Sequence, residues 1–510
     1  MTAPGTRAGE DADDLGAEEA LALVKENRPP HDPAPASRAP HTHDGAPART
    51  PDHRHRATPW PEARATAERA ARTAVRAAGR APLTVPLDAA LGLTLATALP
   101  ALTDLPSFDT SAMDGWAVAG PGPWTVREDG VLAGHAAAPP LTDGEAVRIA
   151  TGARVPPDTT AVLRTEHGRV DHGRPGAGRG EQGRTGPAVT DDGHPGSRPD
   201  SGPGGGHAEH GRTGHESAAS RGTGGPDRLH ATHEVVHGQD IRPRGQECRG
   251  GDQLLPLGTL VTPAVLGLAA AAGYDTLDVV PRPRVDLLVL GDELLTAGLP
   301  REGLIRDALG PMLPPWIRAL GGETGAVRRI GDDAEALHRA ITESTADLIV
   351  TTGGTAAGPV DHVHPVLARI GADLLVDGVR VRPGHPMLLA RTGEAQHLVG
   401  LPGNPLAAVS GLLTLAEPLL RILAARPAPA PRALPARGAV PGHPYDTRLV
   451  PVALRGGGAV PLHYNGPAML RGMAAADALA VVPPGGVRPG QETEILDLPW
   501  AAGGIGVCFT

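Results

Sequence analysis

Between residues 284 and 425, short apolar runs alternate with amphipathic segments. Runs 285–290 and 347–351 are rich in leucine, valine and isoleucine, as is typical of strands buried on both faces of a parallel sheet. Between them, 333–344 places Leu337 and Ile341 four positions apart, and Asp332 or Asp333 precedes them as a helix cap. This alternation predicts an α/β domain with helices on both faces of its sheet.

A second helix of this domain is predicted after residues 398–399. Asn404 is suited to cap it and Pro405 to occupy its first position. The apolar residues that follow form one stripe, which we expect to be buried: Leu406, Val409, Leu413, Leu420 and Leu423. Pro311, Pro314 and Pro315 are expected to delay or bend the helix that follows Asp307.

The flanking regions predict smaller domains. Residues 63–78 carry alanine and arginine at helical spacing, and short apolar runs up to residue 166 suggest small β-structure. Residues 263–272 predict another helix, with Pro263 in its first turn. Runs 449–454, 478–482 and 492–496 predict the strands of a closing β domain.

Two segments lack any apolar period and are expected to be disordered, because they cannot bury enough surface to offset their ordering entropy. One is an N-terminal tail, and the other is a Gly/His/Arg insertion that we interpret as a solvated linker and not as a metal site. The expected plan is a tail 1–60, N-terminal helical/β domains 61–166 and 229–283, an insertion 167–228, an α/β domain 284–425, a linker 426–435 and a C-terminal β domain 436–510.

Composition excludes several classes of protein. The net charge of −10 and an aromatic content of 2% argue against nucleic-acid binding. Two cysteines cannot build a disulfide framework, and no apolar run reaches the length of a membrane span. Without a secretory signal in the sequence, we expect a cytoplasmic protein that has no membrane or nucleic-acid partner.

Candidate chemistry follows the predicted strands, because ligands of open α/β sheets bind beyond the carboxyl ends of the strands. Gly291-Asp292-Glu293-Leu294 supplies two carboxylates, although a polar turn would explain this loop equally well. The glycine-rich segment 351–358 leads to Asp361 and could bring backbone N–H groups to an anion. Arg382 and His385 flank a proline-rich turn and could bind phosphate or another oxyanion. Carboxylates and cations together suit a phosphorylated ligand with a divalent metal.

A further string, Ser111-Ala112-Met113-Asp114-Gly115-Trp116-Ala117, resembles the signature of the molybdopterin molybdenumtransferase family, to which the C-terminal part of gephyrin is related. The resemblance recurs in order along most of residues 61–500. It includes 147–153, 241–258, Gly291-Asp292-Glu293-Leu294, Gly331-Asp332-Asp333, Gly353-Gly354 with Asp361, Arg382-Pro383-Gly384-His385-Pro386 and Leu401-Pro402-Gly403-Asn404-Pro405.

The resemblance implies a multidomain α/β fold, with a three-layer α/β/α molybdopterin-binding domain, an elongated helical/β N-terminal part and a small C-terminal β domain. It implies a homodimer whose sites lie between subunits, and a molybdopterin adenylyltransferase as a possible partner. The implied reaction inserts molybdate into molybdopterin-AMP with release of AMP, assisted by Mg²⁺.

By the same resemblance, the catalytic residues would be Asp114, Glu293, Asp332, Asp333 and Asp361, of which Glu293 and Asp361 would hold the metal. Substrate would be bound by Ser111, Thr151, Asp307, Thr352, Gly353, Gly354, Arg382, His385, Pro402, Gly403 and Asn404.

This chain departs from the family pattern at Ala308, Leu309, Ala356 and His385, where polar or permanently charged groups are usual. Each lost polar contact is expected to weaken ligand binding by about 0.5–1.5 kcal/mol. Two other functions therefore stay open: a molybdopterin adenylyltransferase, and a paralogue that binds molybdopterin without catalysis.

Overall fold

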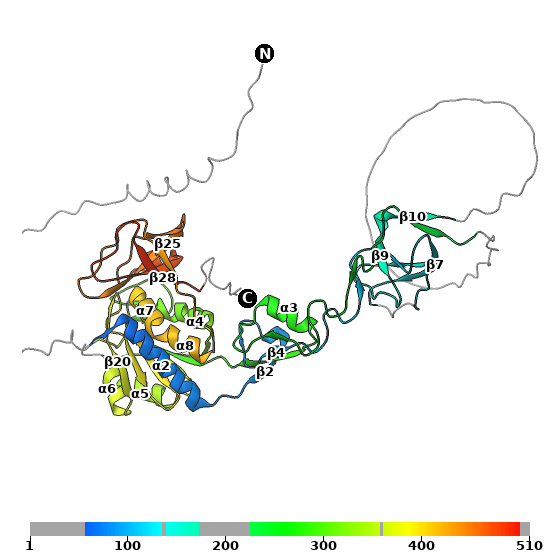
Figure 1. Cartoon of the computed structure of the whole chain (residues 1–510). Helices are drawn as coiled ribbons and strands as arrows, with labels where there is room; N and C mark the ends of the chain where they lie inside the picture. The colour runs from blue at the N-terminus through cyan, green and yellow to red at the C-terminus, as the bar shows by residue number, and fades with distance from the viewer. Residues whose placement is uncertain (1–56, 135–138, 173–224, 357–360, 500–510) are drawn as a thin grey trace, which may run out of the picture. The chain divides into compact units, whose positions relative to one another are not determined.

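The computed structural model describes residues 57–134, 139–172, 225–356 and 361–499 (Figure 1). Most of the expected tail and most of the expected insertion, including His194, His207, His210 and His215, lie outside the described residues.

The α/β domain is built on a six-stranded sheet of order β18-β15-β19-β23-β22-β20. Four neighbouring strands run parallel: β18 (Glu323–Ile330), β15 (Arg284–Leu290), β19 (Leu348–Thr352) and β23 (His397–Leu401). β22 (Leu388–Arg391) is antiparallel to β23, and β20 (Asp373–Asp377) is antiparallel to β22. The α/β prediction is confirmed, with an antiparallel strand added beside the parallel ones.

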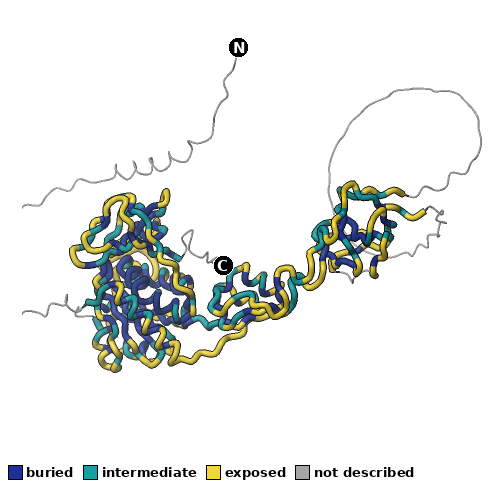
Figure 2. The backbone as a smooth tube through the Cα atoms, in the orientation of Figure 1, coloured by how far each residue is buried: buried dark blue, intermediate teal, exposed yellow. Residues whose placement is uncertain are grey.

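Helices cover both faces of this sheet, which gives three layers. Helices α5 (Ala334–Thr342) and α6 (Val363–Arg369) bury Leu337, Ile341 and Val366 against one face. α4 (Leu309–Ala319), α7 (Pro405–Gly411) and α8 (Glu417–Leu423) belong to the larger core on the other face. Figure 2 shows the buried residues concentrated in the interior of this part of the chain.

Helix α4 differs from the expected delayed helix. It begins at Leu309 and contains Pro314 and Pro315, so the prediction of a delay was wrong. Burial of Leu313, Trp316 and Ile317 compensates for the backbone hydrogen bonds that the two prolines cannot donate.

Residues 405–423 form one long, almost wholly buried helical segment. By length and composition it could cross a membrane, but 83% of its most apolar window is buried inside the protein. The stripe expected from the sequence, Leu406 to Leu423, is buried. Between α7 and α8 the segment contains a π-helical turn, η4 (Leu412–Ala416).

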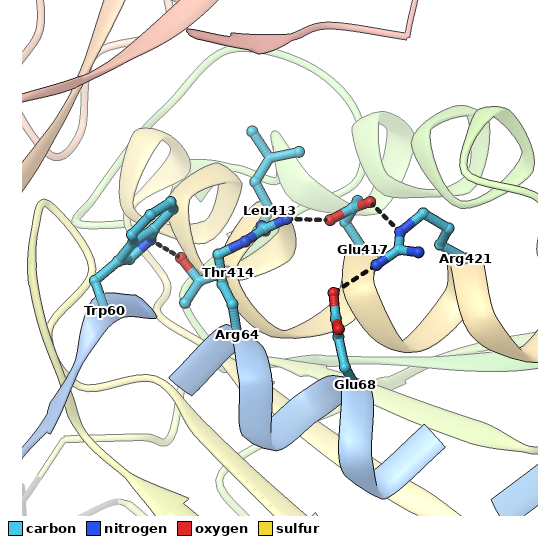
Figure 3. A network of polar contacts seen from close by, with 7 residues as sticks. All are labelled: Trp60, Arg64, Glu68, Leu413, Thr414, Glu417 and Arg421. Atoms are coloured by element: carbon cyan, nitrogen blue, oxygen red, sulfur yellow. Dashed lines mark hydrogen bonds and ion pairs between the residues drawn. The ribbon is translucent and has the colours of Figure 1, made fainter. Parts of the chain in front are cut away.

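The N-terminal helix α2 (Trp60–Ala78) packs on this segment, although more than 300 residues separate the two in sequence (Figures 1 and 3). The Trp60 indole N–H donates to Thr414 Oγ1 at 3.0 Å, and Arg64 donates to the Leu413 carbonyl and to Glu417. Arg421 binds Glu68 at 2.6 Å and Glu417 at 3.3 Å. The alanines of α2 thus complete the core of the α/β domain.

The C-terminal domain is a sheet of order β1-β21-β25-β27-β28-β24, in which β26 also pairs with β25. β25 (Thr447–Arg455), β27 (Ala478–Val482) and β28 (Glu492–Asp497) confirm the three predicted strands. β24 (Ala433–Pro435) and β26 (Gly458–Pro461) add two more. The sheet also recruits β1 (Thr58–Pro59) and β21 (Val379–Arg382), which were not expected there.

Two smaller domains lie between α2 and the α/β domain in sequence. One contains helix α3 (Pro263–Ala271) and strands β2 (Leu83–Pro86), β3 (Thr94–Leu95) and β14 (Thr276–Val280). The other is a six-stranded sheet of β10 (Gly168–Asp171), β11 (Arg228–Ala231), β7 (Trp124–Val131), β8 (Glu145–Ile149), β6 (Gly115–Val118) and β9 (Ala161–Arg164).

Strands β10 and β11 lie at the two ends of the expected insertion and correct its limits. Val170 pairs with Leu229 across β10 and β11, and Leu229 is fully buried. Gly168–Asp171 and Arg228–Ala231 are therefore strand residues, because pairing supplies the burial that their sequence pattern does not indicate.

Candidate functional site

Four loops of the α/β domain start at the same edge of its sheet. Leu290 of β15 pairs with Ile330 of β18, Val289 pairs with Thr352 of β19, and Thr352 pairs with Leu401 of β23. The parallel strands therefore end at one level. The structure brings the segments 291–293, 331–333, 353–354 and 402–404 to the carboxyl edge, where ligands of such sheets bind.

Glycines allow these loops to approach each other closely. A Cβ at Gly331 would lie 2.1 Å from Asp292 Oδ1, so this carboxylate from the β15 loop occupies the space beside the β18 loop. A Cβ at Gly403 would lie 3.8 Å from the Cα of Gly353, which places the β19 and β23 loops side by side. Gly353 and Gly354 have φ angles of +81° and +66°, a conformation that favours glycine.

The carboxylates at this edge have different environments. Glu293 and Asp332 are exposed, and Asp361 is half-buried just after residues outside the described ranges. Asp333 caps helix α5, accepting from the N–H groups of Glu335 at 2.8 Å and Ala336 at 3.0 Å. These two hydrogen bonds lower the pKa of Asp333, so part of its role is structural.

The Arg382–His385 turn reaches the same edge from a different sheet. It precedes β22, whose first residue, Leu388, pairs with Gly400 next to the end of β23. A Cβ at Gly384 would lie 3.0 Å from the Ala407 carbonyl oxygen, so the turn packs directly on α7. The His385 ring nitrogen Nδ1 lies 2.9 Å from the Val379 carbonyl oxygen, to which it donates. Arg382 pairs through Nε with Asp446 Oδ2 at 2.8 Å.

Asp307 occupies a structural position. Its side chain is buried, with Oδ1 accepting from the Gly310 N–H at 2.8 Å and Oδ2 paired with Arg329 at 2.5 Å. The carboxylate thus links the start of α4, the helix that also contains Leu309, to Arg329 of β18. The remaining residues of the expected substrate set include Thr352, which is 2% exposed, and Asn404, whose side chain makes no cap on α7.

Ser111, Asp114 and Thr151 form a second cluster, in the N-terminal part of the chain. Asp114 Oδ1 accepts from the Thr151 N–H at 2.8 Å, and Ser111 Oγ donates to the Met113 carbonyl at 2.6 Å. The Gly152 N–H donates to the Ser111 carbonyl at 2.8 Å. Asp114 and Thr151 are exposed, so this cluster presents a carboxylate on a loop fixed by backbone hydrogen bonds. It lies beside the sheet of β6, whereas the other candidates lie on the loops of the α/β domain or, in the case of Arg382, at the end of β21.

Three features of the site were not expected. The buried Thr351 hydroxyl at the end of β19 has no hydrogen-bond partner in the described part of the chain. The Pro467 carbonyl accepts from the Leu406 N–H at 2.9 Å, which joins a C-terminal-domain loop to the first turn of α7. The third unexpected feature is the pairing of Asp446, from the C-terminal domain, with Arg382. The doubled threonine before two glycines could have indicated Thr351, but no sequence signal connects Pro467 or Asp446 with loops so distant in the chain.

Among its described residues, the sheet edge holds no complete metal cage, and the cavity described below lies elsewhere. Among the described residues, no group of three or more His, Cys, Asp or Glu side chains could hold a metal ion by itself. A cavity of about 590 Å³ lies instead against β7 and β11, lined by Trp124, His230, His233 and His237 among others.

Three family models match consecutive parts of the chain. Residues 58–273 match the MoeA N-terminal region (domain I and II), residues 286–422 a probable molybdopterin binding domain, and residues 433–498 the MoeA C-terminal region (domain IV).

Individual relatives agree with these models. A Mycobacterium tuberculosis protein named molybdopterin molybdenumtransferase 2 is 32% identical over 365 residues, which cover 68% of this chain and 76% of that protein. A Nostoc molybdopterin molybdenumtransferase is 27% identical over 354 residues, covering 66% and 69%. The molybdopterin biosynthesis MoeA protein of Pyrococcus horikoshii shares the fold, with a TM-score of 0.62 at 20% identity over 87% of this chain and 100% of that one.

Proposed function

The chain belongs to the molybdopterin molybdenumtransferase family, and we propose that it inserts molybdate into molybdopterin-AMP with release of AMP, as a transferase of molybdenum cofactor biosynthesis. One observation in the structure supports the proposal most: glycine-rich turns, carboxylates and the Arg382 turn meet at the carboxyl edge of the α/β sheet.

The glycine turns suit the phosphate groups of the substrate. The Gly353 N–H already donates to the Leu401 carbonyl at 2.8 Å, so phosphate oxygens would approach the neighbouring backbone N–H groups of Gly354 and Gly403. The exposed Asn404 would add a wall to this cradle, whereas Thr352 and Pro402 are buried and would support the turns from within the domain. Arg382, whose terminal nitrogens can pair with two oxygens of one oxyanion, would hold molybdate or phosphate beside His385.

His385 presents a particular nitrogen to the ligand. Because Nδ1 donates to the Val379 carbonyl, the other ring nitrogen, Nε2, is the one directed away from that bond. In a neutral ring Nε2 accepts a hydrogen bond, and in a protonated ring it donates one. We therefore assign Arg382 the main attraction for the oxyanion.

The acidic residues fit Mg²⁺ held jointly with a phosphorylated substrate. Mg²⁺ is commonly bound by one or two carboxylates, with phosphate oxygens and waters completing its octahedron. Glu293 and Asp361, with Asp332 and Asp292 nearby in the loop set, offer such carboxylates without a complete protein cage. When bound, the ion would neutralise charge on the phosphate linkage that is cleaved as AMP leaves.

Asp114 and Thr151 would act from the neighbouring subunit. We propose a homodimer in which this cluster, with Ser111, faces the sheet edge of the partner's α/β domain. We also propose a cytoplasmic location and supply of molybdopterin-AMP by a molybdopterin adenylyltransferase.

Purified protein mixed with molybdopterin-AMP and Mg²⁺ tests this function. AMP release that requires molybdate is the expected result, and Glu293→Gln should abolish it. AMP release without any need for molybdate, or tight binding of molybdopterin-AMP without turnover, would contradict the proposed reaction. The second outcome would identify a molybdopterin-binding paralogue, whereas adenylylation of molybdopterin from ATP would identify an adenylyltransferase.

A further inference from the structure

The guanidinium of Arg382 is hydrogen-bonded through Nε and not through its terminal nitrogens within the described structure. Its Nε pairs with Asp446 Oδ2 at 2.8 Å, while its side chain is 48% exposed. Within the described ranges, neither terminal nitrogen of Arg382 has a protein hydrogen-bond partner. Arg382 therefore keeps both terminal nitrogens, the pair best suited to two oxygens of one anion, available for a ligand.

The acceptor, Asp446, belongs to the C-terminal domain and is itself fixed. It directly precedes β25, which pairs in parallel with β21 so that Val381 lies opposite Thr447 and Arg382 opposite Arg448. On its other side β21 pairs with β1, and the Thr58 N–H donates to the Gly378 carbonyl at 3.0 Å. Strand pairing on both sides of β21 thus fixes the backbone positions of Arg382 and Asp446 relative to each other.

Asp446 is only 6% exposed, so its charge needs a partner. His443 lies close, with Nδ1 3.3 Å from Asp446 Oδ2, but that nitrogen accepts the backbone N–H groups of Asp446 at 3.0 Å and Tyr445 at 3.3 Å. A nitrogen that accepts cannot also donate to the carboxylate. Arg382 is therefore the cation that hydrogen-bonds to this buried carboxylate.

We propose that Asp446 is a positioning residue that orients Arg382, so that the C-terminal domain determines how the α/β domain binds a tetrahedral oxyanion. The inference rests on the proposed function and deepens it. Asp446 does not touch the ligand in this proposal. It holds the Nε side of the guanidinium and turns the two terminal nitrogens toward the sheet edge, where the Arg382 turn packs on α7.

The oxyanion could be molybdate or the phosphate of molybdopterin-AMP, and the KM values separate the two. Asp446→Asn keeps the shape and removes the charge that binds Nε. We expect it to raise the KM for one of these two substrates about tenfold, with kcat changed less than about twofold. Arg382→Lys keeps the positive charge but has no Nε fork, and should raise the same KM.

The double variant gives the decisive comparison. If Asp446 acts only through Arg382, adding Asp446→Asn to Arg382→Lys should raise that KM no further, because the interaction is already lost. Independent, multiplying effects of the two substitutions would overturn the proposal. Asp497→Asn is the matched control: Asp497 pairs with Arg432 at 2.8 Å in the same domain, and its loss should leave both KM values unchanged.

A binding measurement separates this inference from the proposed function. Calorimetric titration with molybdate alone, and separately with AMP, should show weaker binding of one of them to the Asp446→Asn protein than to wild type. If wild type lacks turnover but shows this difference, the proposed function fails and the inference stands. Equal affinities of the wild-type and Asp446→Asn proteins for both ligands, or no binding of either ligand by wild type, would contradict the inference. Should Asp446→Asn not fold, Asp446→Glu keeps the buried charge but displaces the guanidinium, and the same loss of affinity is expected.

Discussion

His397 makes the α/β domain sensitive to acid. It is 1% exposed at the start of β23, its Nδ1 lacks a partner in the described structure, and burial lowers its pKa from 6.5 to about 4. The unfolded chain therefore binds a proton between these two pH values when the folded chain does not. The stabilising effect of the neutral ring is fully present above pH 6.5 and is lost as the pH falls toward 4, by at most about 3 kcal/mol.

Replacing His397 with leucine should remove this contribution. We expect the free energy of unfolding of His397→Leu, measured with urea, to fall less between pH 7 and pH 4.5 than that of wild type. His338, which is only half-buried on α5, gives the control substitution, His338→Leu. An identical pH dependence for His397→Leu and wild type would show that the buried imidazole does not cause the acid sensitivity.

Asp307 was expected to bind substrate, but its surroundings favour a structural role. Its two oxygens hold the Gly310 N–H and Arg329. Asp307→Asn should lower the free energy of unfolding by about 1–3 kcal/mol, because a charged hydrogen-bond acceptor is lost in a buried position. The KM for molybdopterin-AMP should change less than about twofold. A large rise in KM with unchanged stability would instead place Asp307 in the substrate site.

These residues show which properties of a side chain can be read from the sequence. Asp333 was recognisable as a possible helix cap, because capping depends on neighbours within three positions. The arginine partners of Asp307 and Asp446 lie 22 and 64 positions away, respectively. Only folding determines whether such a carboxylate faces a ligand or an arginine.

Helix α2 is attached through the π-helical turn of the long buried segment (Figure 3). The turn exposes the Leu413 carbonyl to Arg64 and presents the Thr414 hydroxyl to the Trp60 indole. Trp60→Phe should lower the free energy of unfolding by about 1–3 kcal/mol, because it leaves a buried hydroxyl without its donor. Thr414→Val should have a similar effect.

A double-mutant cycle checks this contact. The combined Trp60→Phe and Thr414→Val change should cost less than the sum of the single changes, because each removes the same hydrogen bond. Arg72→Ala, on the exposed side of α2, should leave stability almost unchanged. Strictly additive costs in urea unfolding would mean that the two side chains are not coupled.

The spacing of apolar residues predicted most of the helices and strands, but it did not predict which segments pack or pair with each other. The positions of β15, β19, α5 and α3 follow from local pattern and caps. β10 and β21 do not, since their burial comes from strands distant in the sequence. The π-helical turn likewise leaves no mark on a pattern that is apolar throughout.

The candidate site likewise contains parts that the sequence predicted and parts that only the structure reveals. Sequence order and the rule for parallel sheets were sufficient to place the loops after β15 and β19 at one edge. β18 was not predicted as a strand, so the position of the loop that follows it comes from the structure. The antiparallel β22 could not be foreseen, yet it is the strand that carries the Arg382 turn back to that edge. The Asp114 cluster lies beside another sheet, so the proposed function requires a neighbouring subunit to bring it to this edge.

Mixed dimers test whether Asp114 and Glu293 act in one site from different subunits. Asp114→Asn and Glu293→Gln should each be inactive alone. In a two-fold symmetric dimer with sites between subunits, a hybrid of the two variants has one site with both intact residues and one with neither. Random pairing makes half of the dimers hybrid, so co-expression should restore about one quarter of wild-type AMP release. If both residues act within one subunit, every site lacks one of them and co-expression restores nothing.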